Sequence, residues 1–110
     1  MSLDPQHLAH LKTLYPDAEV MPEGGVDHIY FPVLPIETNG TVLKMKALLR
    51  LGEHQGYSTR LFVEHQIAGK GQNWNCFQLL GNAWWAPSWN YITVDLPLLA
   101  ILANHLTVFR

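Results

Sequence analysis

Apolar and polar residues alternate most clearly between positions 41 and 51 of this chain. Because successive side chains of a β-strand point to opposite faces, this period of two predicts a strand with one buried face. The other face carries two lysines and an arginine, so we expect it to be largely exposed to water. The core positions are Leu43, Met45, Ala47, Leu49 and Leu51, and they alternate with Val42, Lys44, Lys46, Leu48 and Arg50.

The segments before this strand also have the composition of strands. Residues 18–21 and 26–33 are rich in β-branched and large apolar side chains, and Pro-Glu-Gly-Gly at 22–25 predicts a hairpin turn between them. Pro32 has no N–H to donate, so we expect the second strand to bend, or to lie at a sheet edge, near this residue.

Short turns connect the predicted strands. Asn39-Gly40 supplies two residues that tolerate the positive φ angles of a tight turn, and residues 57–64 predict a last strand after another turn. Strands joined by such short connections pair antiparallel. The pattern therefore predicts an antiparallel meander of three to four strands with one face available for helices.

Helices are predicted near both ends of the chain. Asp4-Pro5 and the pair Asp95 and Pro97 are typical of helix starts, because Asp accepts hydrogen bonds from the first amides and Pro suits the first turn. The first helix is expected to end at Pro16. Apolar residues follow each start at helical spacing: Leu8, Leu11, Leu14 and Tyr15, then Leu98, Leu99, Leu102, Leu106 and Phe109.

Composition favours one globular α+β domain over residues 1–110. Hydrophobic residues make up 48% and charged residues 15%, which is enough apolar surface for a core. The net charge of −2 argues against nucleic acid as a partner. No apolar run approaches the roughly 20 residues of a membrane span, and no signal-peptide pattern is present. A single cysteine forms no internal disulfide, so we expect a cytoplasmic protein.

Candidate chemistry lies in residues 73–90, which contain the only cysteine and all four tryptophans. The preceding segment, residues 65–75, shows no alternation and includes Gly69 and Gly71, so we expect a long loop there. Such a loop would leave Cys76 accessible at the surface, at its junction with a Trp-Pro turn. Accessibility is what a thiolate nucleophile requires.

A cysteine followed by an apolar step and then by Trp-x-Pro resembles the active-site segment of ubiquitin-conjugating enzymes. The matching positions are Cys76, residues 77–80, Trp85 and Pro87. The order of predicted elements, with a helix, a meander, a long active-site loop and a final helix, is similar to an abbreviated ubiquitin-conjugating fold. Compact members of this kind occur in bacteria, beside ubiquitin-like proteins and activating enzymes, in anti-phage defence systems.

The resemblance implies a transferase without a cofactor. Cys76 would accept the C-terminus of a ubiquitin-like protein as a thioester from an activating enzyme, and would pass it to an amine of a target protein. Trp85 and Pro87 would shape the loop. The family carries His-Pro-Asn before the cysteine, and only His65 matches here, so Asn73, Asn75 or His65 would support the oxyanion.

Two other functions are compatible with these residues. One is that of a non-catalytic module of the same fold, which binds a ubiquitin-like protein or another protein and keeps Cys76 for packing. Trp74, Trp84 and Trp89 would alternatively form a platform for a small ligand such as a carbohydrate.

The histidines do not have the spacing of metal ligands, and a second cysteine is lacking, so we expect no metal site. We expect a solvated histidine face instead, with His105 near the negative end of the last helix.

Overall fold

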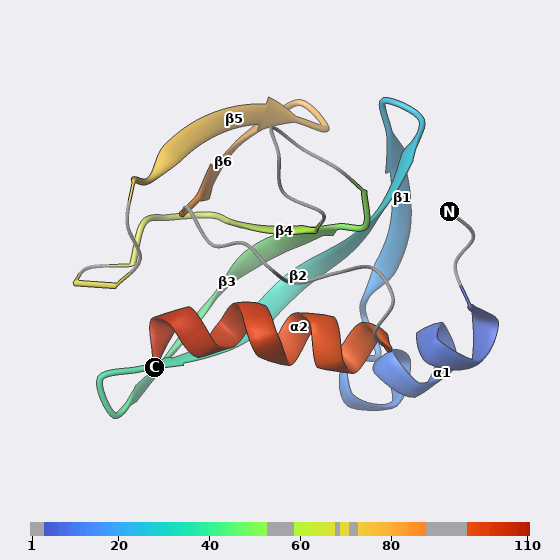
Figure 1. Ribbon diagram of the computed structural model, residues 1–110, viewed down its shortest axis with the longest axis horizontal. Helices are drawn as coiled ribbons and strands as arrows, with labels where there is room; N and C mark the ends of the chain where they lie inside the picture. Colours follow the sequence, from blue (N-terminus) through green and yellow to red (C-terminus); the bar gives the residue numbers. More distant parts are fainter. Residues whose placement is uncertain (1–3, 53–58, 68, 71–72, 88–96) are drawn as a thin grey trace.

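The computed structural model describes residues 4–52, 59–67, 69–70, 73–87 and 97–110. Within these residues the chain forms a six-stranded antiparallel sheet with one helix before it and one after it (Figure 1). The predicted α+β class, the meander and the two helices are therefore confirmed. The elements are α1 (Pro5–Leu14), β1 (Glu19–Glu23), β2 (Val26–Thr38), β3 (Thr41–Arg50), β4 (Arg60–Val63), β5 (Asn75–Leu79), β6 (Asn82–Ala86), α2 (Leu98–Leu106) and the short 3-10 helix η1 (Thr107–Phe109).

The sheet has the strand order β1-β2-β3-β4-β6-β5. The second strand of the last hairpin, and not the first, therefore lies beside β4. Strands β1 to β4 follow one another as the predicted meander. Strand β6 then pairs with β4 through Val63 and Trp85, and β5 becomes the outermost strand. The described residues of the predicted loop, 65–67, 69–70 and 73–74, are in no strand. Residues 75–86, in contrast, form two further strands beyond the three to four that were predicted, and Cys76 lies in the first of them, which corrects its placement in a loop.

Three hairpins close on two-residue turns with positive φ angles. Two of these turns were predicted from their glycine and asparagine residues. The third contains a leucine, and because a bulky side chain at positive φ is uncommon, its residues do not predict a turn. The φ angles are 60° and 78° at Gly24 and Gly25, 51° and 76° at Asn39 and Gly40, and 50° and 75° at Leu80 and Gly81.

Two prolines are tolerated in β2. One lies where the pairing with β3 is irregular, and the other lies beyond the residues that pair with β1. The pairing of β2 with β3 shifts register between Phe31 and Leu34, which is the bend expected near Pro32. Pro35 lies beyond Tyr30, the last residue of β2 that pairs with β1. No described strand therefore requires an N–H from Pro35 on that side.

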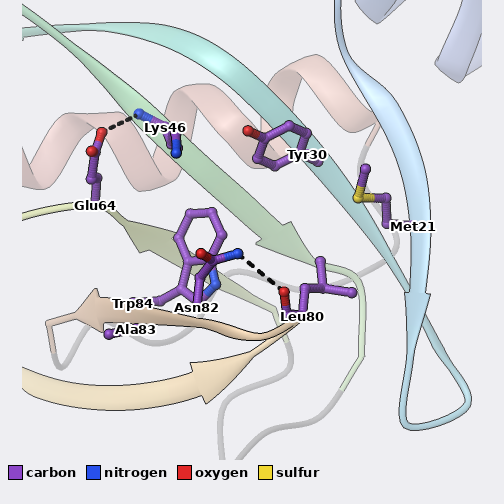
Figure 2. A pocket seen from close by; sticks show the side chains of 8 residues that line it. All are labelled: Met21, Tyr30, Lys46, Glu64, Leu80, Asn82, Ala83 and Trp84. Carbon is purple, nitrogen blue, oxygen red and sulfur yellow. Dashed lines mark hydrogen bonds between the residues drawn. The ribbon is translucent and has the colours of Figure 1, made fainter.

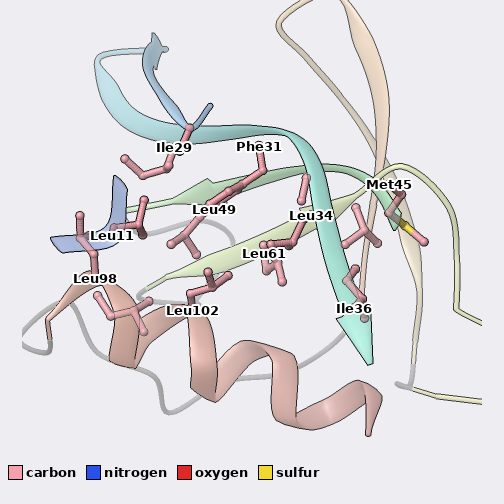
Figure 3. Packing of buried hydrophobic residues seen from close by; sticks show 14 of the residues in the cluster. Leu11, Ile29, Phe31, Leu34, Ile36, Met45, Leu49, Leu61, Leu98 and Leu102 are labelled. Atoms are coloured by element: carbon pink, nitrogen blue, oxygen red, sulfur yellow. The ribbon is translucent and has the colours of Figure 1, made fainter. Parts of the chain in front are cut away.

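The main core lies between the two helices and one face of the sheet. Leu11 of α1 and Leu98 and Leu102 of α2 point toward the sheet, where Ile29 and Leu49 are fully buried (Figure 3). Helix α1 begins where it was predicted, because the Asp4 side chain accepts a hydrogen bond of 2.8 Å from the backbone N–H of Gln6. Pro97 is the N-cap residue of α2, and Asp95, the predicted cap, lies outside the described residues.

A second buried cluster lies on the opposite face of the sheet. This inner cluster consists of Leu48, Phe62, Trp84 and Ala86, against which Tyr30, Phe77, Leu79 and Leu80 pack. The prediction that this face of β3 is largely exposed is wrong at Leu48, because the β5–β6 hairpin covers it. Leu43, predicted to be in the core, is 38% exposed near the turn between β2 and β3.

Two histidines are buried, so the prediction of a solvated histidine face is wrong for them. His105 is 3% exposed, and its Nε2 lies 2.9 Å from Oγ1 of Thr59. Burial, with a smaller contribution from the positive charge of Arg60, lowers the pKa of His105 to about 4. The pKa of His28 is also lowered, mainly by burial. His105 is therefore neutral near pH 7 and does not act as a cation at the end of α2.

Candidate functional site

Cys76 lies on a strand and not on the loop that the sequence predicted. It is the second residue of β5, and its side chain is exposed. The exposure of β5 alternates after Asn75, so that Phe77 and Leu79 are partly buried toward the inner cluster while Cys76 and Gln78 are exposed. The predicted accessibility of the thiol is confirmed, and its setting is corrected from a flexible loop to a hydrogen-bonded hairpin.

The partner of Cys76 across the hairpin is Trp85. The two residues are paired in register, and Trp85 is paired in turn with Val63 on β4. Directly opposed residues of antiparallel strands have Cβ atoms about 4.5–5.5 Å apart, so the thiol lies beside the Trp85 side chain. Trp85 is half-buried and packs against the main core. This tryptophan therefore forms one side of the surroundings of the thiol.

The backbone of β5 offers hydrogen-bonding groups at the edge of the sheet. Hydrogen-bonded and non-hydrogen-bonded pairs alternate along an antiparallel ladder, and a two-residue turn closes on a hydrogen-bonded pair. Leu79 and Phe77 are therefore bonded to β6, opposite Asn82 and Trp84. The N–H and C=O groups of Cys76 and Gln78 consequently point away from β6, and no described strand pairs with that side of β5.

The three polar residues predicted to assist Cys76 are not hydrogen-bonded to it. Nδ2 of Asn75 donates to the backbone oxygen of Asn73 at 2.8 Å, and Asn73 has a φ of 52°. The side chain of His65 is 70% exposed, with Nε2 3.7 Å from the Glu64 carboxylate. Asn75 directly precedes Cys76 and Asn73 lies three residues before it, and no interaction within the described residues links His65 to the cysteine.

Trp85 and Ala86 are the last two residues of β6, and Pro87 follows the strand. The proline is buried and lines a very small cavity with Arg60 and His105. Arg60 itself is 2% exposed, and its guanidinium lies 4.8 Å from the centre of the Phe77 ring. A cation above an aromatic ring is a favourable contact, and this one stabilises Phe77 on the face of β5 that packs against the inner cluster.

The tryptophans that the structure describes are used for packing. Trp84 is 2% exposed, and its Nε1 donates to the backbone oxygen of Leu79 at 2.9 Å. Trp74 stacks on Phe109, with ring centres 6.0 Å apart, and donates to the backbone oxygen of Lys70. The proposed stacking platform is therefore wrong for Trp84, whose ring is covered. Trp89 lies outside the described residues.

A pocket of about 380 Å³ opens on the inner side of the sheet, between the β1–β2 and β5–β6 hairpins (Figure 2). Its apolar wall includes Tyr30 and the edge of Trp84, whose rings meet edge to face with centres 6.3 Å apart. The turn residue Leu80, with its unfavourable φ of 50°, also lines it. The remaining lining residues are Met21, Lys46, Glu64, Asn82 and Ala83.

The polar groups of this pocket are mostly held by the backbone. Oε1 of Glu64 accepts a 3.0 Å hydrogen bond from the backbone N–H of Lys46, and Nδ2 of Asn82 donates to the backbone oxygen of Leu80 at 3.0 Å (Figure 2). One lysine and one glutamate give the lining no net charge. The pocket therefore suits a small neutral ligand with an apolar face and polar edges.

The described residues contain no group of three or more His, Cys, Asp or Glu side chains that could hold a metal ion. None of the described helices has the length and apolar character needed to cross a membrane.

Comparisons of the chain with protein-family models, with curated proteins and with solved structures found no match. The likeness to ubiquitin-conjugating enzymes therefore rests on the residues around Cys76 and on the order of the elements.

Proposed function

We propose that this protein is a compact ubiquitin-conjugating enzyme that carries a ubiquitin-like protein on Cys76. The observation that supports this most is the exposure of the thiol on one strand of the β5–β6 hairpin, whose side chains pack against both clusters of buried residues. A nucleophile held on a hydrogen-bonded strand presents its sulfur in a defined direction, which favours attack on a bound acyl group.

The first step is an exchange between two thioesters. The Cys76 thiolate attacks the carbonyl carbon that links the modifier to a cysteine of its activating enzyme. A new carbon–sulfur bond forms, the old one breaks, and the departing sulfur takes up a proton in place of the one that Cys76 lost. In the second step a target amine attacks the same carbon, the carbon–nitrogen bond forms, and Cys76 leaves as a thiolate while the nitrogen loses a proton.

Neighbouring amides are the proposed support for the oxyanion in both steps. The side-chain nitrogen of Asn75 has two hydrogens, and only one is needed for its bond to Asn73. Asn75 precedes Cys76 on β5, so its side chain begins on the other face of the strand. Asn75, Asn73 and His65 would each support an oxyanion at Cys76 only after a change of side-chain orientation. We place this activity in the cytoplasm, within a bacterial antiviral conjugation pathway, with the modifier, the activating enzyme and the target protein as partners.

The test is the formation of a covalent adduct. With ATP, an activating enzyme and the ubiquitin-like partner, the wild type is expected to form an adduct that excess thiol cleaves. Cys76→Ser would form a thiol-resistant ester if its weaker nucleophile reacts, and Cys76→Ala would form neither. Equal behaviour of wild type and Cys76→Ala would contradict the enzyme and favour the non-catalytic binding module.

The pocket favours a second function, the binding of a small neutral ligand such as a carbohydrate. Titration with methyl hexosides, followed by amide NMR shifts, is expected to move signals of Tyr30 and Asn82 under this function. Ala83→Leu fills the pocket and would remove the shifts, whereas Cys76→Ala would leave them unchanged. A lack of shifts at these residues would eliminate this candidate for the sugars tested.

A further inference from the structure

We infer that the outer edge of β5 binds the extended C-terminal tail of the acyl donor as an additional antiparallel strand. This inference rests on the proposed function, because it assigns the place where the carried chain lies. Its basis is the backbone of β5, whose amide groups at Cys76 and Gln78 point away from β6. Unpaired groups of this kind accept main-chain hydrogen bonds from an extended peptide.

The two edges of the sheet differ in how they are protected. Strand β1, at the opposite edge, carries Glu19, Pro22 and Glu23. Pro22 pairs with Asp27 one position before the hydrogen-bonded pair that closes the β1–β2 turn, so its missing N–H would have faced outward. Charge and proline are the usual means of preventing strand addition at an edge.

Strand β5 has none of these features. Its five residues are Asn75, Cys76, Phe77, Gln78 and Leu79, without charge, proline or glycine. Gln78 occupies the position in its hairpin that Pro22 occupies in the β1–β2 hairpin, one residue before the closing pair. The edge that carries the thiol is therefore the one left open to pairing.

The position of Cys76 within β5 determines the direction of the added strand. Three residues of the strand follow the cysteine, whereas Asn75 alone precedes it. Before Asn75 the chain leaves the extended conformation, with Asn73 at a φ of 52° and its carbonyl already bonded to Asn75. A tail whose terminal carbonyl is joined to Cys76 must therefore lie beside residues 77–79. Its direction is then antiparallel to β5.

The covalent chemistry favours an acyl tail over a second copy of this chain. A thioester on Cys76 brings the last residue of the tail within about one strand spacing, roughly 4.8 Å, of the open edge. A dimer formed through β5 would use only five residues from each copy. That is far fewer than the roughly 20–30 residues that each partner contributes to a stable interface.

A pair of synthetic acyl donors tests the inference without the natural modifier. One is the aryl thioester of an acetylated Val-Thr-Val-Thr-Ala peptide, and the other is the acetyl thioester of the same thiol, which has no chain to pair. The rate of Cys76 acylation by each is followed by intact-protein mass spectrometry. The rate with the peptide donor, divided by the rate with the acetyl donor, separates the effect of strand pairing from the reactivity of the thiol.

Proline at position 78 removes the outward N–H, as Pro22 does in β1. We expect Gln78→Pro to lower the rate ratio about tenfold, the effect of losing one or two hydrogen bonds, while Gln78→Ala keeps it within about twofold. N-methylation of the peptide at its Thr residues is expected to lower the ratio similarly with the wild-type protein. If thermal unfolding shows that Gln78→Pro does not fold, the N-methylated peptide with the wild-type protein tests the inference by itself.

The outcomes separate this inference from the proposed function. If neither donor acylates the exposed Cys76, the proposed function itself is contradicted. If both donors react and neither Gln78→Pro nor N-methylation changes the ratio, strand addition is wrong while the thiol chemistry stands. If sedimentation shows a dimer of the wild type that Gln78→Pro dissociates, the edge is occupied by a second copy and the inference is overturned.

Discussion

Cys76 lies directly opposite Trp85 in the β5–β6 hairpin, and Trp85 lies directly opposite Val63 of β4. The exposed thiol is thus two strands away from a fully buried valine of the main core, with one half-buried indole between them. Cross-strand neighbours of this kind stabilise a sheet by packing. The packing of this tryptophan therefore contributes to the position of the sulfur, together with the contacts of Phe77 and Leu79 on the other face of β5.

The two adjacent tryptophans of β6 are expected to differ in their contribution to stability. Trp84→Ala removes a ring that is 2% exposed, its hydrogen bond to Leu79 and its contact with Tyr30, and should cost about 3–5 kcal/mol. Trp85→Ala removes a half-buried ring and should cost less, about 1–3 kcal/mol. Denaturant titration measures both, and the opposite ranking would contradict the packing described above.

The thiol of Cys76 is expected to react in the folded protein. Because the side chain is exposed, labelling by a disulfide reagent at neutral pH should proceed at a rate within about tenfold of that of the unfolded chain. Cys76→Ala provides the background. Reaction that occurs only after addition of denaturant would show that the thiol is covered, and would remove the basis of the proposed function.

Stability is expected to fall in mild acid because His105 is buried and neutral. Its pKa is about 4 in the folded protein and about 6.5 as the ordinary value. Above pH 6.5 the residue is neutral in both states, and its stabilising contribution is complete. As the pH falls toward 4, the unfolded chain takes up a proton that the folded protein excludes, so the free energy of unfolding decreases by about 3 kcal/mol in total.

A matched pair of variants isolates this effect. His105→Gln does not titrate and keeps an amide near Thr59, so its unfolding free energy should depend less on pH between 6.5 and 4. His10→Gln, at an exposed position of α1, should retain the wild-type pH dependence. Chemical denaturation at several pH values measures both, and identical slopes for His105→Gln and wild type would refute the burial of a neutral histidine.

Strand β1 is expected to cause association between copies of the protein when its proline and its glutamates are replaced. Pro22→Thr restores an outward N–H to β1, and combining it with Glu19→Thr and Glu23→Thr also removes the charges. The triple variant should show concentration-dependent association by light scattering under conditions where the wild type does not. Glu37→Thr, an exposed change outside β1, serves as the control. A monomeric triple variant would show that these residues do not protect the edge.

Much of the fold follows from local signals in the sequence. Asp4 and Pro5 begin α1 as expected, and the alternation from Met45 to Leu51 places its apolar side chains in the main core. Asn39-Gly40 forms the turn that its composition predicts. These features were predictable because each depends on neighbours in the chain.

The β5–β6 hairpin was not predicted because its strongest determinants are distant in sequence. Its turn uses Leu80 at positive φ, and its strands are held by packing against Leu48 and Phe62 of other strands. The alternation of Phe77 and Leu79 with Cys76 and Gln78 was a signal that could have indicated β5. Accessibility of the cysteine was inferred correctly, whereas its position on an edge strand required the pairing of β6 with β4.

The β5–β6 hairpin is joined to the rest of the sheet through one paired position, Val63 with Trp85, while β2 and β3 share a ladder of nine paired positions. Ladders of such unequal length favour opening of the smaller unit while the larger one remains intact. Amide hydrogen exchange in β5 and β6 would then be faster than in β2 and β3. The hairpin that carries the thiol would thus open before the β2–β3 pair does. A chain bound along the edge of β5 would favour the closed hairpin, and would therefore slow the exchange of the β5 and β6 amides with solvent.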